Sequence, residues 1–368
     1  VPAIAQHYYS DAQKADWLKK AQENTPELFY TTIKPEIQVD IVADKQAFQG
    51  YKAVNPRKAE GLYSESFKGK SGIVLDLGDH YTGYFTFRVE EFQSDSDAPI
   101  RLKFTFAEVP AELRIPFDPY KGTISRAWLQ DEVVTIEQLP ATIKIPRRLS
   151  CRYLQIDILG DSQYAQYRIS DMQFVGQTSA KGAPSALTTS DKLLQEIDKV
   201  SQKTLKECMQ TVFEDGPKRD HRLWIGDLYL QMLADNYTFQ NRALAKRCLY
   251  ILAGLSKDDG YLNHTIFETP VPHPQVVPIL LYEYALIYNA TLNDYLQETK
   301  DTQIALDLWP VAKRQIEKIP SLLDKDGLFD PEKANKQGLW QLVDWQESLD
   351  RQASEQGIYI FALEQTYQ

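Results

Sequence analysis

The stretch QTSAKGAPSALTTS, residues 177–190, decides how this chain is divided. It is rich in small and polar residues and contains both Gly and Pro, which is typical of a linker between two folded cores. The runs before it alternate with a period of two, and the runs after it repeat with a spacing of three to four. We therefore predict a β domain followed by an α domain, with residues 179–190 as the linker.

Short β-rich runs fill the segment that precedes the linker. GYFTFRVEEF (83–92) and RYLQIDIL (152–159) are two of them, and Gly, Pro, Asp and Ser turns separate such runs at intervals of roughly ten residues. This pattern is typical of an antiparallel sandwich. We predict a jelly-roll-like β-sandwich over residues 31–178, preceded by a helical appendage over residues 1–30, where DAQKADWLKKAQ has a helical pattern.

Apolar residues recur at helical spacing after the linker. LYLQMLADNYTFQNRALAKRCLYIL (228–252) and WPVAKRQIEKIPSLL (309–323) are examples, and turn sequences such as DDG (258–260) separate these runs. We predict an all-α domain of helical hairpins over residues 191–368. The helix after the linker has an apolar face made by Leu193, Leu194, Ile197 and Val200.

Composition excludes several classes of function. Lys and Arg number 41 against 51 Asp and Glu, so the net charge is −10 and the pI is about 5.2, the wrong sign for a general polyanion binder. We therefore expect neither nucleic acid nor a membrane as a partner. No apolar run reaches about 18 residues and no basic leader is visible, so we expect a soluble, cytoplasmic protein.

Cysteine and histidine usage gives no sign of a disulfide framework or a metal centre. Cys151, Cys208 and Cys248 are widely spaced and form no CxxC, which favours a reducing compartment. The five histidines are scattered singly, so no zinc-ligand spacing is present and we predict no metal site.

The segment EDGPKRDHRLWIGD, residues 214–227, carries the densest group of reactive side chains. A solvated charged loop is the ordinary interpretation of such a segment. However, Trp224 and Ile225 lie inside it, and Gly216, Pro217 and Gly226 punctuate it, which indicates a packed and shaped turn. Its charged members are Glu214, Asp215, Lys218, Arg219, Asp220, Arg222 and Asp227.

Carboxylates next to an aromatic ring fit one chemistry in particular. Glycoside hydrolysis uses one carboxylic acid to protonate the leaving oxygen and a second carboxylate to activate water or attack carbon. A neighbouring arginine lowers the pKa of a carboxyl group, so burial or other carboxylates must raise the pKa of the acid.

The loop resembles the signature of the family 78 glycoside hydrolases, the α-L-rhamnosidases. Asp215-Gly216-Pro217-Lys218-Arg219-Asp220 followed by Trp224-Ile225-Gly226-Asp227 matches the family pattern of Asp, Cys or Gly, Pro, any residue, Arg, Asp or Glu, then Trp, any residue, Gly, Asp. LDLGDHYTGYFTFRV (75–89), DDGYLNH (258–264) and LWQLVDW (339–345) are also similar. The resemblance covers roughly residues 70–368 and implies a β-sandwich followed by an (α/α)6 barrel.

The resemblance also implies catalytic roles. Asp220 stands where many members carry the general acid, and Asp215 and Asp227 would bind sugar hydroxyls or tune that acid. Arg219 would orient the carboxylates. The family reaction is inverting and needs no cofactor or metal, and the expected partner is a carbohydrate, an L-rhamnosyl glycoside.

Five further residues are candidates for substrate binding. Trp224, Asp344 and Trp345 would form the wall of the sugar pocket, and His264 lies in a loop that faces the sugar in the family. His221 follows Asp220, at a position where some members have the acidic residue.

The chain departs from the family pattern in two respects. Asp220 is one methylene shorter than the usual Glu. A twelve-helix barrel needs roughly 350 residues, and residues 191–368 supply about half of that, so we expect an incomplete barrel and a general base beyond residue 368.

Two alternatives to an active rhamnosidase remain open. The chain could be a non-catalytic carbohydrate-binding or scaffold fragment of such an enzyme, or a helical-barrel hydrolase of another deoxy sugar or uronate. An open half-barrel would also bury its exposed helices against a partner, so we expect a homo-oligomer.

Overall fold

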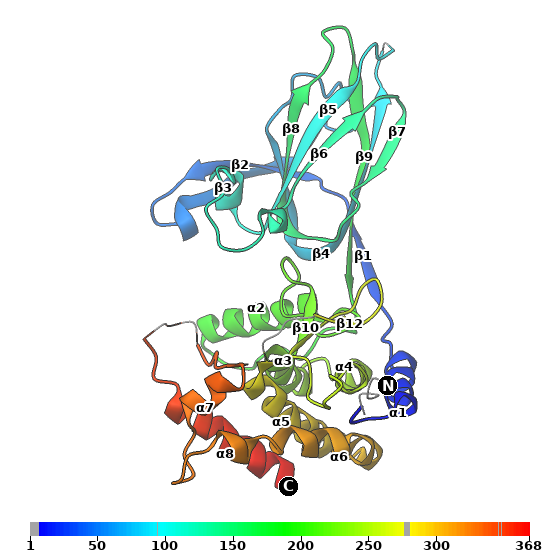
Figure 1. The fold of residues 1–368 in the computed structure, drawn as a ribbon. Coiled ribbons are helices and arrows are strands. Elements are labelled where there is room, and N and C mark those ends of the chain that lie inside the picture. The colour runs from blue at the N-terminus through cyan, green and yellow to red at the C-terminus, as the bar shows by residue number, and fades with distance from the viewer. Residues whose placement is uncertain (1–6, 94, 276–279, 345, 347) are drawn as a thin grey trace. The chain divides into compact units, whose positions relative to one another are not determined.

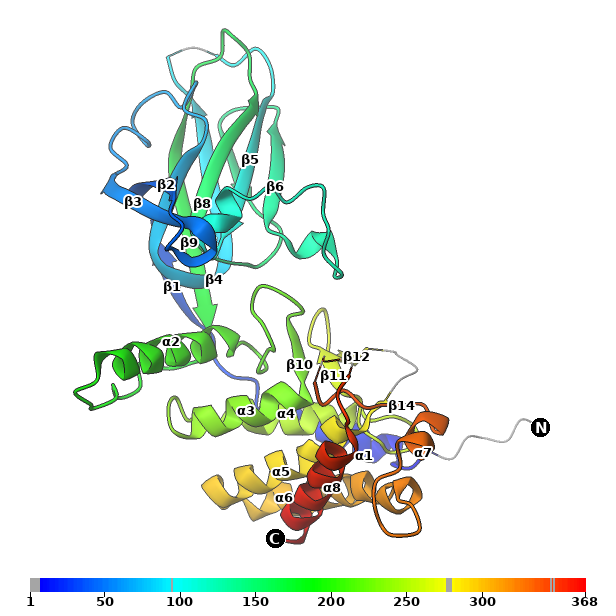
Figure 2. The same cartoon turned by 90° about the vertical axis from the view of Figure 1, so that its left-hand side faces the viewer.

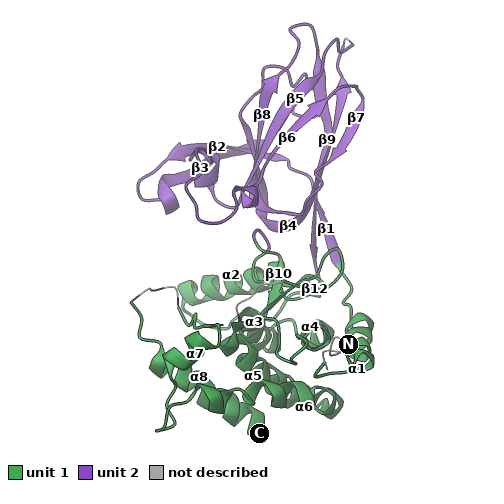
Figure 3. Cartoon of the chain, in the orientation of Figure 1, with its two compact units in different colours: residues 1–28, 179–216, 220–368 green, residues 29–178, 217–219 purple. Residues whose placement is uncertain are grey.

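The computed structural model describes all residues except 1–6, 94, 276–279, 345 and 347. The chain forms two compact units (Figure 3). The helical unit comprises the segments 1–28, 179–216 and 220–368, and the β unit comprises 29–178 together with 217–219.

The described strands of the β unit form one antiparallel sheet of nine strands in which the long strand β4 pairs with four others (Figure 1). The first part of β4 pairs with β2 and its last part pairs with β9 and β7. β8 pairs with β4 on both sides of a register shift between Asp76 and Tyr81. The strands are β1 (Phe29–Ile33), β2 (Ile37–Ala43), β3 (Tyr51–Lys58), β4 (Ile73–Glu91), β5 (Ile100–Ala107), β6 (Asp131–Ile136), β7 (Ala141–Lys144), β8 (Leu149–Gly160) and β9 (Tyr167–Thr178).

Alternating apolar residues of these strands form the core of the β unit. Phe85 and Phe87 on β4 and Phe104 and Phe106 on β5 point to the same interior and are almost completely buried. The rings of Phe87 and Phe104 lie 4.4 Å apart. Because a strand turns successive side chains to opposite faces, the period of two read from the sequence places these rings inside.

The helical unit contains eight α-helices among the described residues. α5 packs against α3, α6 and α8 (Figures 1 and 2). The helices are α1 (Asp11–Glu23), α2 (Lys192–Cys208), α3 (Ile225–Asn236), α4 (Arg242–Gly254), α5 (Tyr282–Thr299), α6 (Thr302–Ile316), α7 (Pro331–Lys336) and α8 (Gln352–Tyr367). Short 3₁₀ turns are η1 (Phe48–Gly50), η2 (Pro110–Leu113) and η3 (Arg126–Trp128) in the β unit, and η4 (Ile319–Leu322) in the helical unit.

The helix that the sequence predicts near the N-terminus is α1, which belongs to the helical unit. α1 packs along α4 within the helical unit, with Trp17 and Ala21 buried. The guanidinium of Arg247 on α4 donates a hydrogen bond to the carbonyl oxygen of Ala21 at 2.9 Å. This partner lies more than two hundred residues away in the chain, so local sequence could not reveal it.

Two small sheets lie between the helices of the helical unit. β10 (Arg222–Trp224), β11 (Thr265–Phe267) and β12 (His273–Pro274) form an antiparallel sheet. β13 (Leu280–Leu281) and β14 (Leu339–Trp340) form a parallel pair. Strands of two or three residues are too short to show a period of two in the sequence.

The apolar face of α2 is exposed. Leu193 and Val200 are each more than 60% exposed, and Leu194 and Ile197 about half. A helix with such a face ordinarily buries it. In the described part of the chain, no helix is both long and apolar enough to cross a bilayer.

Candidate active site

The predicted catalytic residues lie on one stretch that follows α2 and ends in the first turn of α3, which we call the carboxyl loop, Asp215–Asp227. Its first part closes on itself, because the backbone N–H of Asp215 donates to the carbonyl oxygen of Arg222 at 3.0 Å. In return, the backbone N–H of Arg222 donates to Oδ1 of Asp215 at 3.2 Å. The Asp215 carboxyl group is therefore fixed beside β10.

The tip of this loop, residues 217–219, groups with the β unit. Lys218 forms ion pairs there with Glu112 and, at 3.0 Å, with Glu108. The resemblance implies that Arg219 orients the carboxylates. Its side chain is exposed and forms no ion pair with a carboxylate in the described part of the chain.

The arginine that contacts Asp220 is Arg222. Its Nη2 lies 3.3 Å from Oδ1 of Asp220, and its Nε donates to the Asp220 carbonyl oxygen at 3.3 Å. Asp220 and the half-buried His221 both have positive φ angles, 65° and 52°. Residues other than glycine rarely adopt positive φ angles, and two such residues in succession indicate a tightly shaped turn. The Asp220 side chain remains 21% exposed, so solvent reaches it.

Arg222 is itself held in place by β11 and β12. Its guanidinium lies 4.5 Å from the centre of the Phe267 ring, and that ring stacks on His273 at 5.2 Å. Nη1 of Arg222 donates to Oε1 of Gln275 at 2.6 Å. A guanidinium restrained on several sides presents Asp220 with a fixed positive charge.

Burial raises the pKa of two carboxyl groups in the loop. The pKa of Asp215 rises to about 7, because the group is buried and because Asp220 and Asp227 are nearby charges. The pKa of Asp227, in the first turn of α3, is also raised by burial and by the charge of Asp220. The structure therefore brings Asp215, Asp220 and Asp227 into one electrostatic cluster, which is the arrangement that acid–base chemistry uses.

Trp224 forms an aromatic wall beside this cluster. Its ring lies 5.4 Å from the ring of His264 and 6.2 Å from that of Tyr284. His264 is buried, which lowers its pKa to about 4, so its ring is neutral at physiological pH. Nε1 of Trp224 is buried without a hydrogen-bond partner among the described residues.

The last two predicted binding residues follow β14. Asp344 is exposed, and its carbonyl oxygen accepts a hydrogen bond from Nη2 of Arg351 at 2.9 Å. Trp345 lies outside the described residues.

Sequence reasoning missed Tyr284, in the first turn of α5. A Cβ atom at Gly226 would meet the Tyr284 ring at 2.6 Å, so the ring packs directly on the backbone of the carboxyl loop. Burial and the charges of Asp227, Glu283 and Asp215 raise the Tyr284 pKa to about 12. Gly226 could have indicated this contact from the sequence, since a glycine inside a packed loop often allows the close approach of another group.

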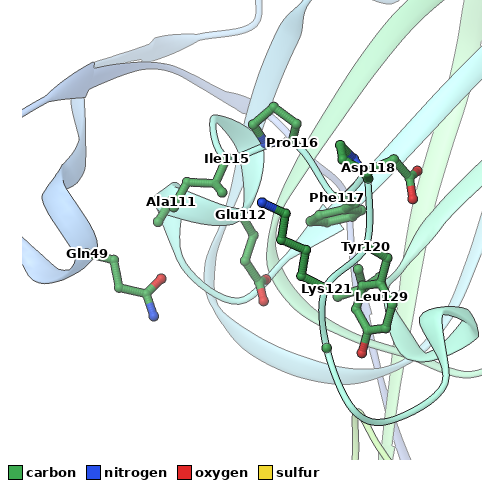
Figure 4. Close-up of a pocket in the computed structure, with 12 residues that line it drawn as sticks. Gln49, Ala111, Glu112, Ile115, Pro116, Phe117, Asp118, Tyr120, Lys121 and Leu129 are labelled. Carbon is green, nitrogen blue, oxygen red and sulfur yellow. The ribbon is translucent and has the colours of Figure 1, made fainter.

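The β unit contains a separate pocket of about 560 Å³ (Figure 4). Phe117, Tyr120 and Leu129 supply its apolar lining, and Glu112 and Lys121 are among its polar residues. None of the predicted site residues lines it. Among the described residues, no group of three or more His, Cys, Asp or Glu side chains could hold a metal ion.

Comparisons with known proteins identify the family of the chain. Residues 35–176 match the glycosyl hydrolase family 78 α-rhamnosidase N-terminal domain. Residues 183–362 match the bacterial α-L-rhamnosidase 6 hairpin glycosidase domain. The solved structure of a rhamnosidase from Klebsiella oxytoca with rhamnose bound is 36% identical, with a TM-score of 0.88 over 96% of this chain. The chain belongs to glycoside hydrolase family 78.

Other family 78 structures share the fold at lower identity. The rhamnosidase of Bacillus sp. GL1 is 20% identical, with a TM-score of 0.64 over 80% of this chain. The Streptomyces avermitilis α-L-rhamnosidase complexed with L-rhamnose is 15% identical, with a TM-score of 0.56 over 87%. The chain spans 67% of the Klebsiella oxytoca protein, 28% of the Bacillus protein and 31% of the Streptomyces protein. No curated protein sequence matches the chain.

The raised pKa of Asp215 predicts a pH-dependent effect on stability. The pKa of Asp215 is about 7 in the folded chain and about 3.8 in the unfolded chain, so between these pH values the folded chain binds more protons. The free energy of unfolding therefore falls as pH rises from about 4 to 7. Asp215→Asn removes this penalty and should raise the Tm by a few degrees at pH 8 but not at pH 4. Calorimetric scans at both pH values measure the difference.

The exposed Asp326 provides the control, since Asp326→Asn should leave the Tm unchanged at both pH values. An Asp215→Asn chain whose Tm differs from the wild type equally at pH 4 and pH 8 would contradict the assignment.

Proposed function

We propose that this chain binds a terminal α-L-rhamnosyl residue and hydrolyses its glycosidic bond with inversion. The observation that carries this proposal is the cluster of Asp215, Asp220 and Asp227 against Trp224 in a family 78 chain. The similarity to a rhamnosidase whose structure holds rhamnose supports L-rhamnose as the sugar.

Asp220 is the proposed general acid. Its carboxyl group is solvent-accessible at the turn. Burial raises the pKa of Asp215 to about 7 and raises that of Asp227. A protonated carboxyl group can both donate hydrogen bonds to sugar hydroxyls and accept hydrogen bonds from them. Trp224 would pack on the sugar ring.

The chemistry follows from these roles. Asp220 would protonate the glycosidic oxygen as the bond to the anomeric carbon breaks, and positive charge would develop on the sugar ring. Inversion also requires a second carboxylate that takes a proton from water on the opposite face of the ring, so turnover by the 368-residue chain requires this base from the chain itself or from a second copy. Arg222 would stabilise the Asp220 carboxylate that remains after proton transfer.

Two measurements on the 368-residue chain test the proposed function. Hydrolysis of 4-nitrophenyl α-L-rhamnoside reports turnover, and calorimetry with L-rhamnose reports binding, with L-fucose as the control sugar. We expect both turnover and selective L-rhamnose binding. Binding without turnover would instead support the second candidate, a non-catalytic carbohydrate-binding chain, which is motivated by the 67% coverage of the Klebsiella oxytoca relative. Absence of both would contradict the proposal.

We also propose that the chain self-associates through the apolar face of α2. The face consists of Leu193, Leu194, Ile197 and Val200, all exposed. Light scattering should therefore give a mass above the 42.3 kDa of the monomer. Ile197→Glu places a charge at the centre of this face and should restore the monomer. A wild-type chain that is monomeric at high micromolar concentration would contradict the proposal.

A further inference from the structure

The turn that follows β14 has a backbone conformation that needs support. Val343 has a φ of 43°, in a region that a β-branched residue seldom adopts. Such a conformation persists only where the surrounding structure holds it. The turn, Leu342–Asp344, ends in a residue that the sequence predicts to line the sugar pocket.

Glu283 supplies this support from α5. Its side chain is almost completely buried, and Oε1 accepts a hydrogen bond from the backbone N–H of Leu342 at 2.9 Å. Its carboxyl group also interacts with the backbone N–H of Val343. Oε1 of Glu283 therefore holds the turn through the Leu342 amide, whereas Oε2 is buried with no hydrogen-bond partner among the described residues. Hydrogen bonds to a charged acceptor are stronger than neutral ones.

Arg351 holds the same turn through its carbonyl groups. Nε donates to the carbonyl oxygen of Leu342 at 3.1 Å, and Nη2 donates to that of Asp344 at 2.9 Å. Glu283 thus holds the turn through a backbone N–H group, and Arg351 holds it through two carbonyl oxygens. Glu283 and Arg351 come from α5 and from the residue before α8, two helices that pack together.

A second buried carboxyl group, that of Glu355 on α8, lies close to Glu283. Both are almost completely buried, and burial raises the pKa of each. The charge of Glu283 raises the Glu355 pKa further, and Arg351 opposes this. Because the two amides favour the charged form of Glu283, the proton belongs on Glu355. Burial and the charges of both carboxyl groups also raise the pKa of Tyr359.

The residue next to Glu283 contacts the other part of the site. Tyr284 packs on Gly226 and lies 6.2 Å from Trp224, both in the carboxyl loop. Two successive residues of α5 therefore contact the carboxyl loop and the Leu342–Asp344 turn.

We propose that Glu283 is a positioning residue of the rhamnoside site, which fixes the Leu342–Asp344 turn relative to the carboxyl loop by accepting a hydrogen bond from the Leu342 amide. The inference rests on the proposed function for its consequence in sugar binding. Its structural part, the restraint of the turn, is tested separately below.

The test compares three variants of the full chain. Glu283→Met keeps the length of the side chain but removes the acceptor, Glu283→Gln keeps one acceptor oxygen, and Glu355→Gln changes the neighbouring buried acid without touching the turn. Hydrogen exchange measures the Leu342 and Val343 amides, calorimetry measures the Kd for L-rhamnose, and a thermal scan measures the fold.

In Glu283→Met, we expect the two amides to exchange about tenfold faster and the Kd to rise about tenfold, because the hydrogen bond that restrains the turn is lost. Glu283→Gln should recover part of both effects, and Glu355→Gln should show neither. Exchange elsewhere in α5 and α8 should not change, which separates positioning from loss of the fold.

Two results would overturn the inference. Unchanged amide exchange in a folded Glu283→Met chain would show that Glu283 does not restrain the turn. Faster exchange with an unchanged Kd would show that the turn does not position the sugar site. If the wild-type chain itself does not bind L-rhamnose, the proposed function fails, and the exchange rates alone then decide whether Glu283 restrains the turn.

Discussion

Asp220→Asn is expected to lower kcat for an alkyl α-L-rhamnoside by roughly 10²–10⁴-fold, the usual contribution of a general acid. The loss should be much smaller for 4-nitrophenyl α-L-rhamnoside, because nitrophenolate leaves without needing a proton. Asparagine retains the shape of Asp220, so the fold and the Kd for L-rhamnose should change little. Initial rates on both substrates at equal concentrations of folded protein measure the effect.

The neighbouring carboxyl groups provide the comparison. Asp227→Asn should reduce turnover of both substrates by a similar factor, because a residue that binds sugar hydroxyls acts regardless of the leaving group. Full activity of Asp220→Asn on the alkyl rhamnoside would rule out Asp220 as the acid. An equal loss on both substrates would assign it a binding role instead.

Gly83→Ala is expected to have the largest effect on stability. Gly83 on β4 faces Gly176 on β9, and a Cβ atom at position 83 would lie 1.9 Å from the carbonyl oxygen of Val175. The clash is with the backbone of a paired strand, so no side-chain rotation relieves it. We expect a loss of about 2–4 kcal/mol in the free energy of unfolding, measured by urea denaturation.

Gly160 at the end of β8 is the matched control. A Cβ atom there would meet nothing within 4 Å, so Gly160→Ala should change the free energy of unfolding by less than about 0.5 kcal/mol. Equal urea midpoints for the two variants would contradict the close approach of β4 and β9.

Features set by local pattern could be predicted from the sequence. The alternation around Phe85 and Phe87 determines which side chains enter the core of the β unit, and this pattern is visible in ten residues. The spacing of Asp215, Asp220 and Asp227 likewise indicated the carboxyl cluster, because a single loop carries all three residues.

Features set by distant partners could not be predicted. α1 joined the helical unit through contacts with α4, and Arg222 rather than Arg219 reached Asp220 because β11 and β12 hold its guanidinium. Glu283 and Glu355 are both buried on two helices that pack together, α5 and α8, and the sequence does not show this pairing. A helical period gives the buried face but not the partner that neutralises a buried charge.

The location of bound L-rhamnose tests the central claim most directly. A crystal structure of the chain soaked with L-rhamnose should show the sugar in contact with Asp215, Asp220 and Asp227, with its ring against Trp224. Sugar bound only elsewhere, for example in the pocket of the β unit lined by Phe117 and Tyr120, would contradict the assignment of the carboxyl loop as the active site.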